Sequence, residues 1–297
     1  MSFHLQRSKA ADGFARFDVE LDATQPYLSD HRPGGEPLFG TTMGIAVMRE
    51  AVEAELSKAP FEPSNAPFEL SNIELISPII LADQSVAHAV VLVESRPTSY
   101  IVSVSTGGDD RPIVHCRAMF GPSPVAVDSA LPLGSGGWRW SATGADVYRC
   151  FFHGPAFQVI GRCALVDDQM WSEMSAAVMP LWSADTPDSQ SDAHAIELGL
   201  QTAGLLELAM DRRMMIPKRI GRIAHGPGRL GPGSRAMARR ASVSVATSSF
   251  TIDVVDSSGS PILVIHDYET QPLPFASDAH AVHTLAALLS TSPTAAP

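Results

Sequence analysis

One candidate for acid–base chemistry is a histidine that precedes a glycine-rich loop. The segment DHRPGGEPLFGTTMG places His31 before Gly35 and Gly40, and a helix is predicted to begin with Thr41 or Thr42 as its cap. A helix N-terminus offers unpaired backbone N–H groups, so a carbonyl oxygen held beside Thr41 would be stabilised as it gains negative charge. A neutral imidazole, with an ordinary pKa of about 6.5, is a usable base near neutral pH. The motif predicts a base next to an oxyanion site; the alternative is an ordinary loop histidine among turn-forming glycines.

A second candidate lies on a predicted helix with the sequence HAIELGLQTAGLLELAM. Glu197 and Gln201 are four residues apart, so they share one helix face with Leu205 and Leu208. If Glu197 is buried on this apolar stripe, its pKa should rise above about 4.3, and its protonated form could donate to a leaving group. Gln201 could hold the carboxyl in one orientation by a side-chain hydrogen bond. The alternative is a solvated pair near the start of the helix.

The segment FFHGPAFQ forms a third motif between these two. His153, Gly154 and Pro155 predict a tight turn, and Phe157 leads into an apolar strand. His153 is one of ten histidines in the chain. By itself the motif indicates no more than a turn.

The candidate side chains need a scaffold that brings distant segments together. The first half predicts a strand at residues 14–21, a helix from residue 41 to about residue 56, and then an antiparallel meander. The second half repeats this order of elements around the helix that carries Glu197. An α+β fold follows, in which each half has one antiparallel sheet wrapped around one helix. The predicted parts are an N-terminal unit, a linker, a C-terminal unit and a linker-like tail, at residues 1–120, 121–146, 147–275 and 276–297.

Composition argues against several classes of function. The net charge of -11 opposes a broad electrostatic grip on nucleic acid or on an anionic membrane. The three cysteines form no CxxC pair, so neither a disulfide framework nor a zinc site is signalled. The N-terminus lacks the apolar core of a signal peptide, and Pro78, Asp83 and His88 interrupt the most hydrophobic stretch. We therefore expect a cytoplasmic protein with no metal site, no membrane anchor and no nucleic-acid partner.

In their order and spacing, the three motifs resemble the landmarks of dehydratase domains from polyketide synthases and polyunsaturated fatty acid synthases. The resemblance spans about residues 14–275 and implies a double-hotdog fold. It also implies that a histidine from the first half and an acid from the second-half helix meet across a substrate tunnel. The implied reaction removes water from a β-hydroxyacyl thioester. An acyl carrier protein would bring this substrate on its phosphopantetheine arm, and the domain itself would bind no cofactor.

The catalytic pair can be carried over by position. His31 and Gly35 match the family pattern HxxxGxxxxP, whereas Gly40 stands where that pattern has proline. The resemblance therefore makes His31 the base. Glu197 stands where modular synthases usually have aspartate, which makes it the acid, and Gln201 matches the polar residue one turn later.

The third motif matches the family pattern GYxYGPxF only in part. Phe151 and His153 replace its two tyrosines, and His153 could donate a hydrogen bond in place of one of them. The expected oxyanion or substrate-binding residues are therefore Gly35, Gly40, Thr41, His153, Gly154, Pro155 and Phe157.

Other functions fit the same motifs. A double-bond isomerase or a cyclase could use the same His–acid pair, and the departures at Gly40, Phe151 and His153 also allow a catalytically inactive structural domain.

Partners can be predicted from the same resemblance and from local charge. Residues 211–240 contain nine basic residues against a single acid, and we expect Arg219 and Arg222 to dock the acidic carrier protein or its phosphate. Neighbouring synthase domains are further expected partners, and the sequence leaves homodimer formation open.

Overall fold

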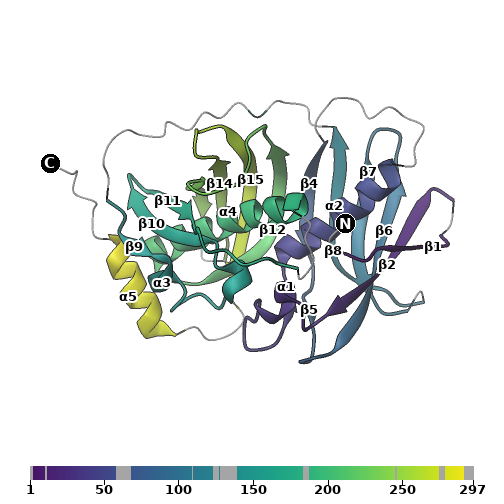
Figure 1. Ribbon diagram of the computed structural model, residues 1–297, viewed down its shortest axis with the longest axis horizontal. Coiled ribbons are helices and arrows are strands. Elements are labelled where there is room, and N and C mark those ends of the chain that lie inside the picture. The colour runs from purple at the N-terminus through teal and green to yellow at the C-terminus, as the bar shows by residue number, and fades with distance from the viewer. Residues whose placement is uncertain are drawn as a thin grey trace.

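The computed structural model describes most of the chain and shows two similar halves (Figure 1). It describes residues 3–290 except residues 11, 58–67, 109, 123–126, 128–138, 183–186, 245 and 274–277. Most of the predicted linker at residues 121–146 lies outside the described residues. Among those described, no helix is both long and apolar enough to span a membrane.

The first half places one long helix against an antiparallel sheet. Its helix α2 packs on β6, β7 and β8, which follow one another in the sheet as the predicted meander. The elements of this half are β1 (Gln6–Ser8), β2 (Phe14–Asp22), α1 (Pro26–Ser29), β3 (Leu38–Phe39), α2 (Thr41–Leu56), β4 (Phe68–Leu75), β5 (Ile79–Ile80), β6 (Val86–Ser95), β7 (Tyr100–Thr106) and β8 (Ile113–Pro122).

The second half repeats this plan around a longer helix. Helix α4 packs on the strands from β10 to β15, most closely on β11, β13 and β14. The elements of this half are β9 (Ala142–Thr143), α3 (Gly144–Val147), the short 3-10 helix η1 (Pro155–Phe157), β10 (Ile160–Val166), β11 (Gln169–Met174), α4 (Pro187–Asp211), β12 (Met215–His225), β13 (Arg235–Val243), β14 (Ser248–Val255), β15 (Pro261–Pro272) and α5 (Ala279–Ser290).

The two sheets join edge to edge into one sheet of 13 strands. In each half the strand that follows the long helix lies innermost, so β4 and β12 pair antiparallel, with Ile73 opposite Ile220. The strand order is β1-β2-β6-β7-β8-β4-β12-β15-β14-β13-β11-β10-β9. Figure 1 shows α2 and α4 next to each other on the same side of this sheet. This is the predicted α+β double hotdog, with a continuous sheet that sequence patterns could not indicate.

Burial explains why the two long helices take the central positions. Met43, Ile45 and Met48 of α2 are almost fully buried, as are Leu205 and Leu206 of α4. Burying such a side chain stabilises the fold by about 1.5–3 kcal/mol relative to leaving it exposed. Both helices are therefore fixed by the core, and residues at their ends can be held in position against each other.

The predicted linker-like tail differs from the structure. Residues 279–290 form helix α5, which packs on α4, β9 and β10. Val282, Leu285, Ala286 and Leu289 are buried, at the i, i+3, i+4 and i+7 spacing of an apolar helix face. The alanine- and serine-rich composition hid this periodicity. Strand β9 and most of α3 likewise fall within the predicted linker range.

Candidate active site

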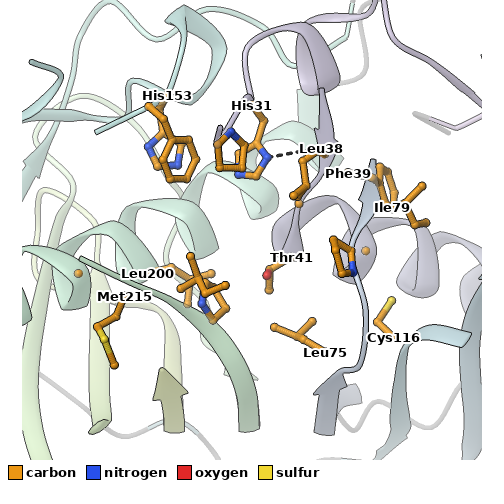
Figure 2. A pocket seen from close by; sticks show the side chains of 18 of the residues that line it. His31, Leu38, Phe39, Thr41, Leu75, Ile79, Cys116, His153, Leu200 and Met215 are labelled. Atoms are coloured by element: carbon orange, nitrogen blue, oxygen red, sulfur yellow. Dashed lines mark hydrogen bonds between the residues drawn. The ribbon is translucent and has the colours of Figure 1, made fainter. Parts of the chain in front are cut away.

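His31 lies in the loop between α1 and β3, with its ring held in one orientation. Its Nδ1 is 2.8 Å from the carbonyl oxygen of Leu38 (Figure 2). A carbonyl only accepts hydrogen bonds, so the neutral ring carries its proton on Nδ1 and leaves the Nε2 lone pair free. Burial, together with the nearby charge of His153, lowers the pKa of His31 to about 4. The ring is therefore neutral at pH 7 and has the protonation state that a base requires.

Gly40 lies directly against this ring. A Cβ atom added at Gly40 would lie 2.9 Å from Cε1 and 3.1 Å from Nε2 of His31. The φ angle of Gly40 is -75°, an angle open to any residue, so glycine is needed here for space and not for backbone conformation. In this chain, the absence of a Cβ atom at Gly40 leaves the space that the His31 ring occupies.

The start of α2 corrects the expected cap. Gly40 is the N-cap residue, and neither threonine caps the helix with its side chain. Thr41 is the first helical residue and lines the cavity described below, where its backbone N–H belongs to the unpaired first turn. The hydroxyl of Thr42 instead donates across to α4, 2.5 Å from Oε2 of Glu197.

Glu197 is buried on α4, with only 6% of its surface exposed. Its Oε2 accepts from Thr42, and its Oε1 lies 2.8 Å from Nε2 of Gln201 and 3.3 Å from Nε2 of His153. Burial alone raises the pKa of this carboxyl, but the hydrogen bond and charge of His153, the charge of His31 and the Thr42 hydrogen bond outweigh it and lower the pKa to about 2. The expectation of a raised pKa was therefore wrong, because the sequence did not indicate which donors surround the carboxyl.

Gln201 has the hydrogen-bond pattern that fixes an amide. Its Nε2 donates both to Glu197 and to the carbonyl oxygen of Phe157, while its Oε1 accepts from the Tyr148 hydroxyl at 2.8 Å. The Tyr148 hydroxyl in turn accepts from the backbone N–H of Ile160. Each polar group in this series of hydrogen bonds has a partner. The carboxyl of Glu197 is therefore held in one orientation. The solvated Glu–Gln pair is thereby excluded.

The turn at residues 153–157 joins the two halves of the molecule. His31 and His153 form an isolated antiparallel β-bridge, and the Gly154 N–H donates to the Asp30 carbonyl oxygen at 2.7 Å. The Asp30 side chain accepts from the Ala156 N–H at 2.8 Å. A Cβ atom at Gly154 would lie 2.8 Å from Asp30 side-chain atoms, so the close approach requires glycine. This contact brings the two histidines together, with their ring centroids 5.5 Å apart.

A cavity of about 560 Å³ lies beneath these residues and between the two halves. Figure 2 shows His31 and His153 next to each other at one end, with Thr41, Leu200 and Met215 further along the walls. Of the predicted site residues, His31, Gly40, Thr41, His153, Glu197 and Gln201 line the cavity.

The other predicted binding residues do not line the cavity, so their assignment to substrate contact is corrected. Gly35 has a positive φ of 99° and lies outside the wall, Pro155 is exposed, and Gly154 is at the turn between the halves. Phe157 is buried behind His31, at 5.2 Å between ring centroids. These four residues shape the loops that hold the lining residues.

Arg219 and Arg222 lie on β12, away from the cavity wall, although the wall includes Met214 and the first three residues of this strand, 215–217. Arg219 Nη1 lies 3.0 Å from Oε1 of Glu269, and Arg222 Nε lies 3.9 Å from Oε2 of Glu69. The segment looked almost purely basic in sequence because these acids come from neighbouring strands. The Arg219–Glu269 pair is partly exposed, and such pairs stabilise a fold only slightly.

Two residues of the site were missed in the sequence. Thr42 belongs to the first motif, and its hydroxyl contacts Glu197 from the opposite helix. Tyr148 supports Gln201 but stands outside every motif. The threonine next to a predicted helix start was a detectable signal, whereas nothing in the sequence singled out Tyr148.

Comparisons with known proteins agree with this architecture. Residues 4–107 match the family model described as polyketide synthase dehydratase domain. None of the curated proteins matches the chain in sequence.

Solved structures match over nearly the whole chain. A trans-AT polyketide synthase dehydratase domain from Brevibacillus brevis has a TM-score of 0.72 at 15% identity, covering 91% of this chain and 97% of its own. The dehydratase domain of RzxB from Pseudomonas fluorescens has a TM-score of 0.70 at 15% identity, with coverages of 90% and 97%. The dehydratase domain of PpsC from Mycobacterium tuberculosis, in complex with C12:1-CoA, has a TM-score of 0.68 at 18% identity, with coverages of 90% and 97%. At such identities the likeness shows the fold.

The resemblance first seen in the motifs is thus confirmed, since residues 4–107 match the polyketide synthase dehydratase family and the described chain has the double-hotdog fold of its dehydratase domains.

Proposed function

We propose that the chain removes water from a β-hydroxyacyl thioester and yields an α,β-enoyl thioester. The observation that carries this proposal is the meeting of His31 and Glu197, from different halves of the molecule, on the wall of one cavity. His31 has a free Nε2 lone pair, and Glu197 is a buried carboxyl in a fixed orientation. An imidazole base opposite a carboxyl is the arrangement that a β-elimination needs.

His31 acts as the base in this reaction. Its Nε2 takes the α-proton, and the electrons of the C–H bond form the double bond as the bond between Cβ and oxygen breaks. The backbone N–H of Thr41, which begins α2 and lines the cavity, stabilises the negative charge on the thioester oxygen in this proposal. The helix dipole adds to this stabilisation.

Glu197 faces the departing hydroxyl and directs a proton to it. Its low pKa means that the free carboxyl is ionised at neutral pH, so the proton must be drawn from a neighbouring group. His153, at 3.3 Å, is a titratable group within reach. The acid is therefore best described as Glu197 together with its hydrogen-bonded surroundings.

The substrate class follows from the cavity and from the relatives. Leu75, Ile79, Leu200 and Met215 give much of the wall an apolar surface suited to an acyl chain. The structure of the PpsC domain contains C12:1-CoA, an acyl thioester, which supports a thioester ligand here. We propose that an acyl carrier protein delivers the chain on phosphopantetheine, that no cofactor is bound by the domain itself, and that the domain works in the cytoplasm beside other synthase domains.

A carrier protein needs a docking surface near the cavity. Arg219 and Arg222 follow the lining segment 214–217 on β12, and we propose that they steer the acidic carrier or its phosphate. Both arginines have acidic neighbours, which offset part of their positive charge. Only the remaining positive charge can steer the carrier, and salt screens it.

The proposed function can be tested with a short β-hydroxyacyl thioester. We expect the wild-type protein to form the enoyl product and His31→Ala to lower kcat/KM by about 10²-fold or more. His266→Ala, on β15 away from the cavity, is a matched control that should retain activity. Turnover by His31→Ala at the wild-type rate would rule out this mechanism. A product with a shifted double bond or a ring would instead identify an isomerase or a cyclase.

A further inference from the structure

His153 occupies a position that calls for a chemical role. Its side chain is only 8% exposed and lines the cavity, and its Nε2 lies 3.3 Å from Oε1 of Glu197. Its Nδ1 is buried and has no hydrogen-bond partner among the described residues. Phe152 stacks on the ring at 4.3 Å between centroids and holds it in place. An unpaired buried ring nitrogen is costly, which suggests that it gains a partner when substrate binds.

We propose that His153 is a third catalytic residue, which shares one proton with Glu197 and supplies it to the departing β-hydroxyl. This proposal rests on the dehydration proposed above and identifies the source of the proton. A lone carboxylate with three donors around it holds a proton weakly. The Nε2 atom of His153 lies 3.3 Å from this carboxylate and can carry a proton between it and the hydroxyl oxygen.

The titratable groups around His153 are consistent with a shared proton. Glu197 on α4 and His31 on the opposite loop face it directly. Asp30 accepts from Ala156 in the turn that follows His153. Further out, burial raises the pKa values of Tyr148 and Tyr268 and lowers that of His194, and the negative charge of Glu197 raises all three. Glu36 also lines the cavity, but it is exposed, whereas Glu197 is buried and lies 3.3 Å from His153.

The proton balance of the cycle is closed. His31 gains the α-proton, and the His153–Glu197 pair loses one proton to the hydroxyl oxygen, which takes the electron pair of the broken bond and leaves as water. His31 then returns its proton to the pair through the departing water or through solvent water. The enzyme ends in its starting state, and no oxidant, reductant or co-reactant is required.

The test is the pH dependence of kcat/KM for a short β-hydroxyacyl thioester in wild type and His153→Phe, with His153→Gln as a second variant. Phenylalanine keeps a ring stacked on Phe152, and glutamine keeps a hydrogen-bond donor, but neither can titrate. In the wild type, activity should fall below about pH 4, where His31 becomes protonated, and again at high pH, where no proton remains to be donated to the hydroxyl.

In both variants we expect kcat/KM at pH 7 to fall by about 10-fold to 10²-fold and the alkaline limb to move by about one pH unit or more toward acid. The shift arises because Glu197 alone must then hold the proton. An unchanged alkaline limb, with a uniform loss at every pH, would overturn the proposal and leave His153 as a positioning residue.

A matched control and a second readout separate the role of His153 from the dehydration reaction itself. His266→Gln should keep both limbs of the wild-type profile. If His31→Ala abolishes turnover while the His153 variants keep the alkaline limb of the wild-type pH profile, the dehydration mechanism is supported. The catalytic role of His153 is then ruled out. If His31→Ala is as active as the wild type, the dehydration mechanism is ruled out. The proposal for His153, which depends on that mechanism, is then ruled out as well.

Discussion

Helix α4 carries two buried glutamates with different surroundings. Glu197 is 6% exposed and Glu207, ten residues later, is fully buried. Glu207 accepts from Ser248 at 2.6 Å, from Thr270 at 2.9 Å and from Arg213 at 2.9 Å. Glu197 accepts from Thr42 and Gln201 and lies beside His153.

The difference lies in what the partners can do. The partners of Glu207 are two hydroxyls and a guanidinium, none of which releases a proton near neutral pH, and Glu207 does not line the cavity. Glu197 lines the cavity and has a titratable imidazole next to it. Burial of a carboxyl therefore does not mark a catalytic acid. What identifies a catalytic acid is a buried carboxyl that lines the cavity and has a neighbouring group with an exchangeable proton.

The largest expected effect comes from Glu197→Gln. This change keeps the size of the side chain but removes the charge and the shared proton. We expect kcat/KM for a β-hydroxyacyl thioester to fall by about 10²-fold to 10⁴-fold, with a melting temperature close to that of the wild type. Steady-state kinetics and thermal unfolding of the same preparation check both parts. Full activity in this variant would remove Glu197 from the mechanism.

Glu207→Ala should give the opposite pattern. It removes the acceptor of two buried hydroxyls and one of several partners of Arg213, so we expect the free energy of unfolding to fall by about 1–3 kcal/mol. The kcat of the remaining folded protein should stay near that of the wild type. Urea denaturation and active-site-normalised kinetics measure these quantities. A loss of kcat in fully folded protein would contradict the division between the two glutamates.

A smaller effect is expected from removing one hydroxyl at each carboxyl. Thr42→Val deletes the donor to Glu197, and Ser248→Ala deletes a donor to Glu207. A hydrogen bond to a charged group contributes about 1.5–3 kcal/mol, so Thr42→Val should lower kcat/KM by about 10-fold or more. Ser248→Ala should lower stability by a similar free energy and leave kcat unchanged. If both variants lost stability but kept the wild-type kcat/KM, Thr42 would have no part in orienting the acid.

The smallest effect is expected outside the cavity, at Arg219 and Arg222. Reversing both to glutamate should raise KM for a carrier-bound substrate about threefold at low salt, and the effect should fade as salt screens the charges. Turnover of a small thioester should not change. A comparison of the two substrates at two ionic strengths is sufficient. Equal losses with both substrates would show that the arginines serve the fold.

Local patterns predicted much of the fold. The helix expected from residue 41 to about residue 56 is α2 (Thr41–Leu56), and the Glu197–Gln201 hydrogen bond follows from i, i+4 spacing. The β4–β12 junction was not predictable, because strand periodicity says which face is buried but not which strand lies alongside. Helix α5 was hidden by its composition.

The electrostatics of the site were the least predictable part. The apolar stripe around Glu197 correctly indicated burial, and burial alone would raise its pKa. The donors that reverse this effect come from residues 44 and 155 positions away in sequence, His153 and Thr42. Only the fold brings them to the carboxyl. For the same reason the ion pairs of Arg219 and Arg222 could not be seen from their own basic segment.

The most direct test of the account is a single-turnover experiment on one β-hydroxyacyl thioester, with products analysed by mass and by double-bond position. We predict that the wild-type protein converts it to the α,β-enoyl thioester with loss of one water, that Glu207→Gln does the same, and that Glu197→Gln and His31→Ala do so at least about 10²-fold more slowly. Unchanged substrate with the wild-type protein, or the same enoyl product at the same rate from Glu197→Gln, would contradict the account.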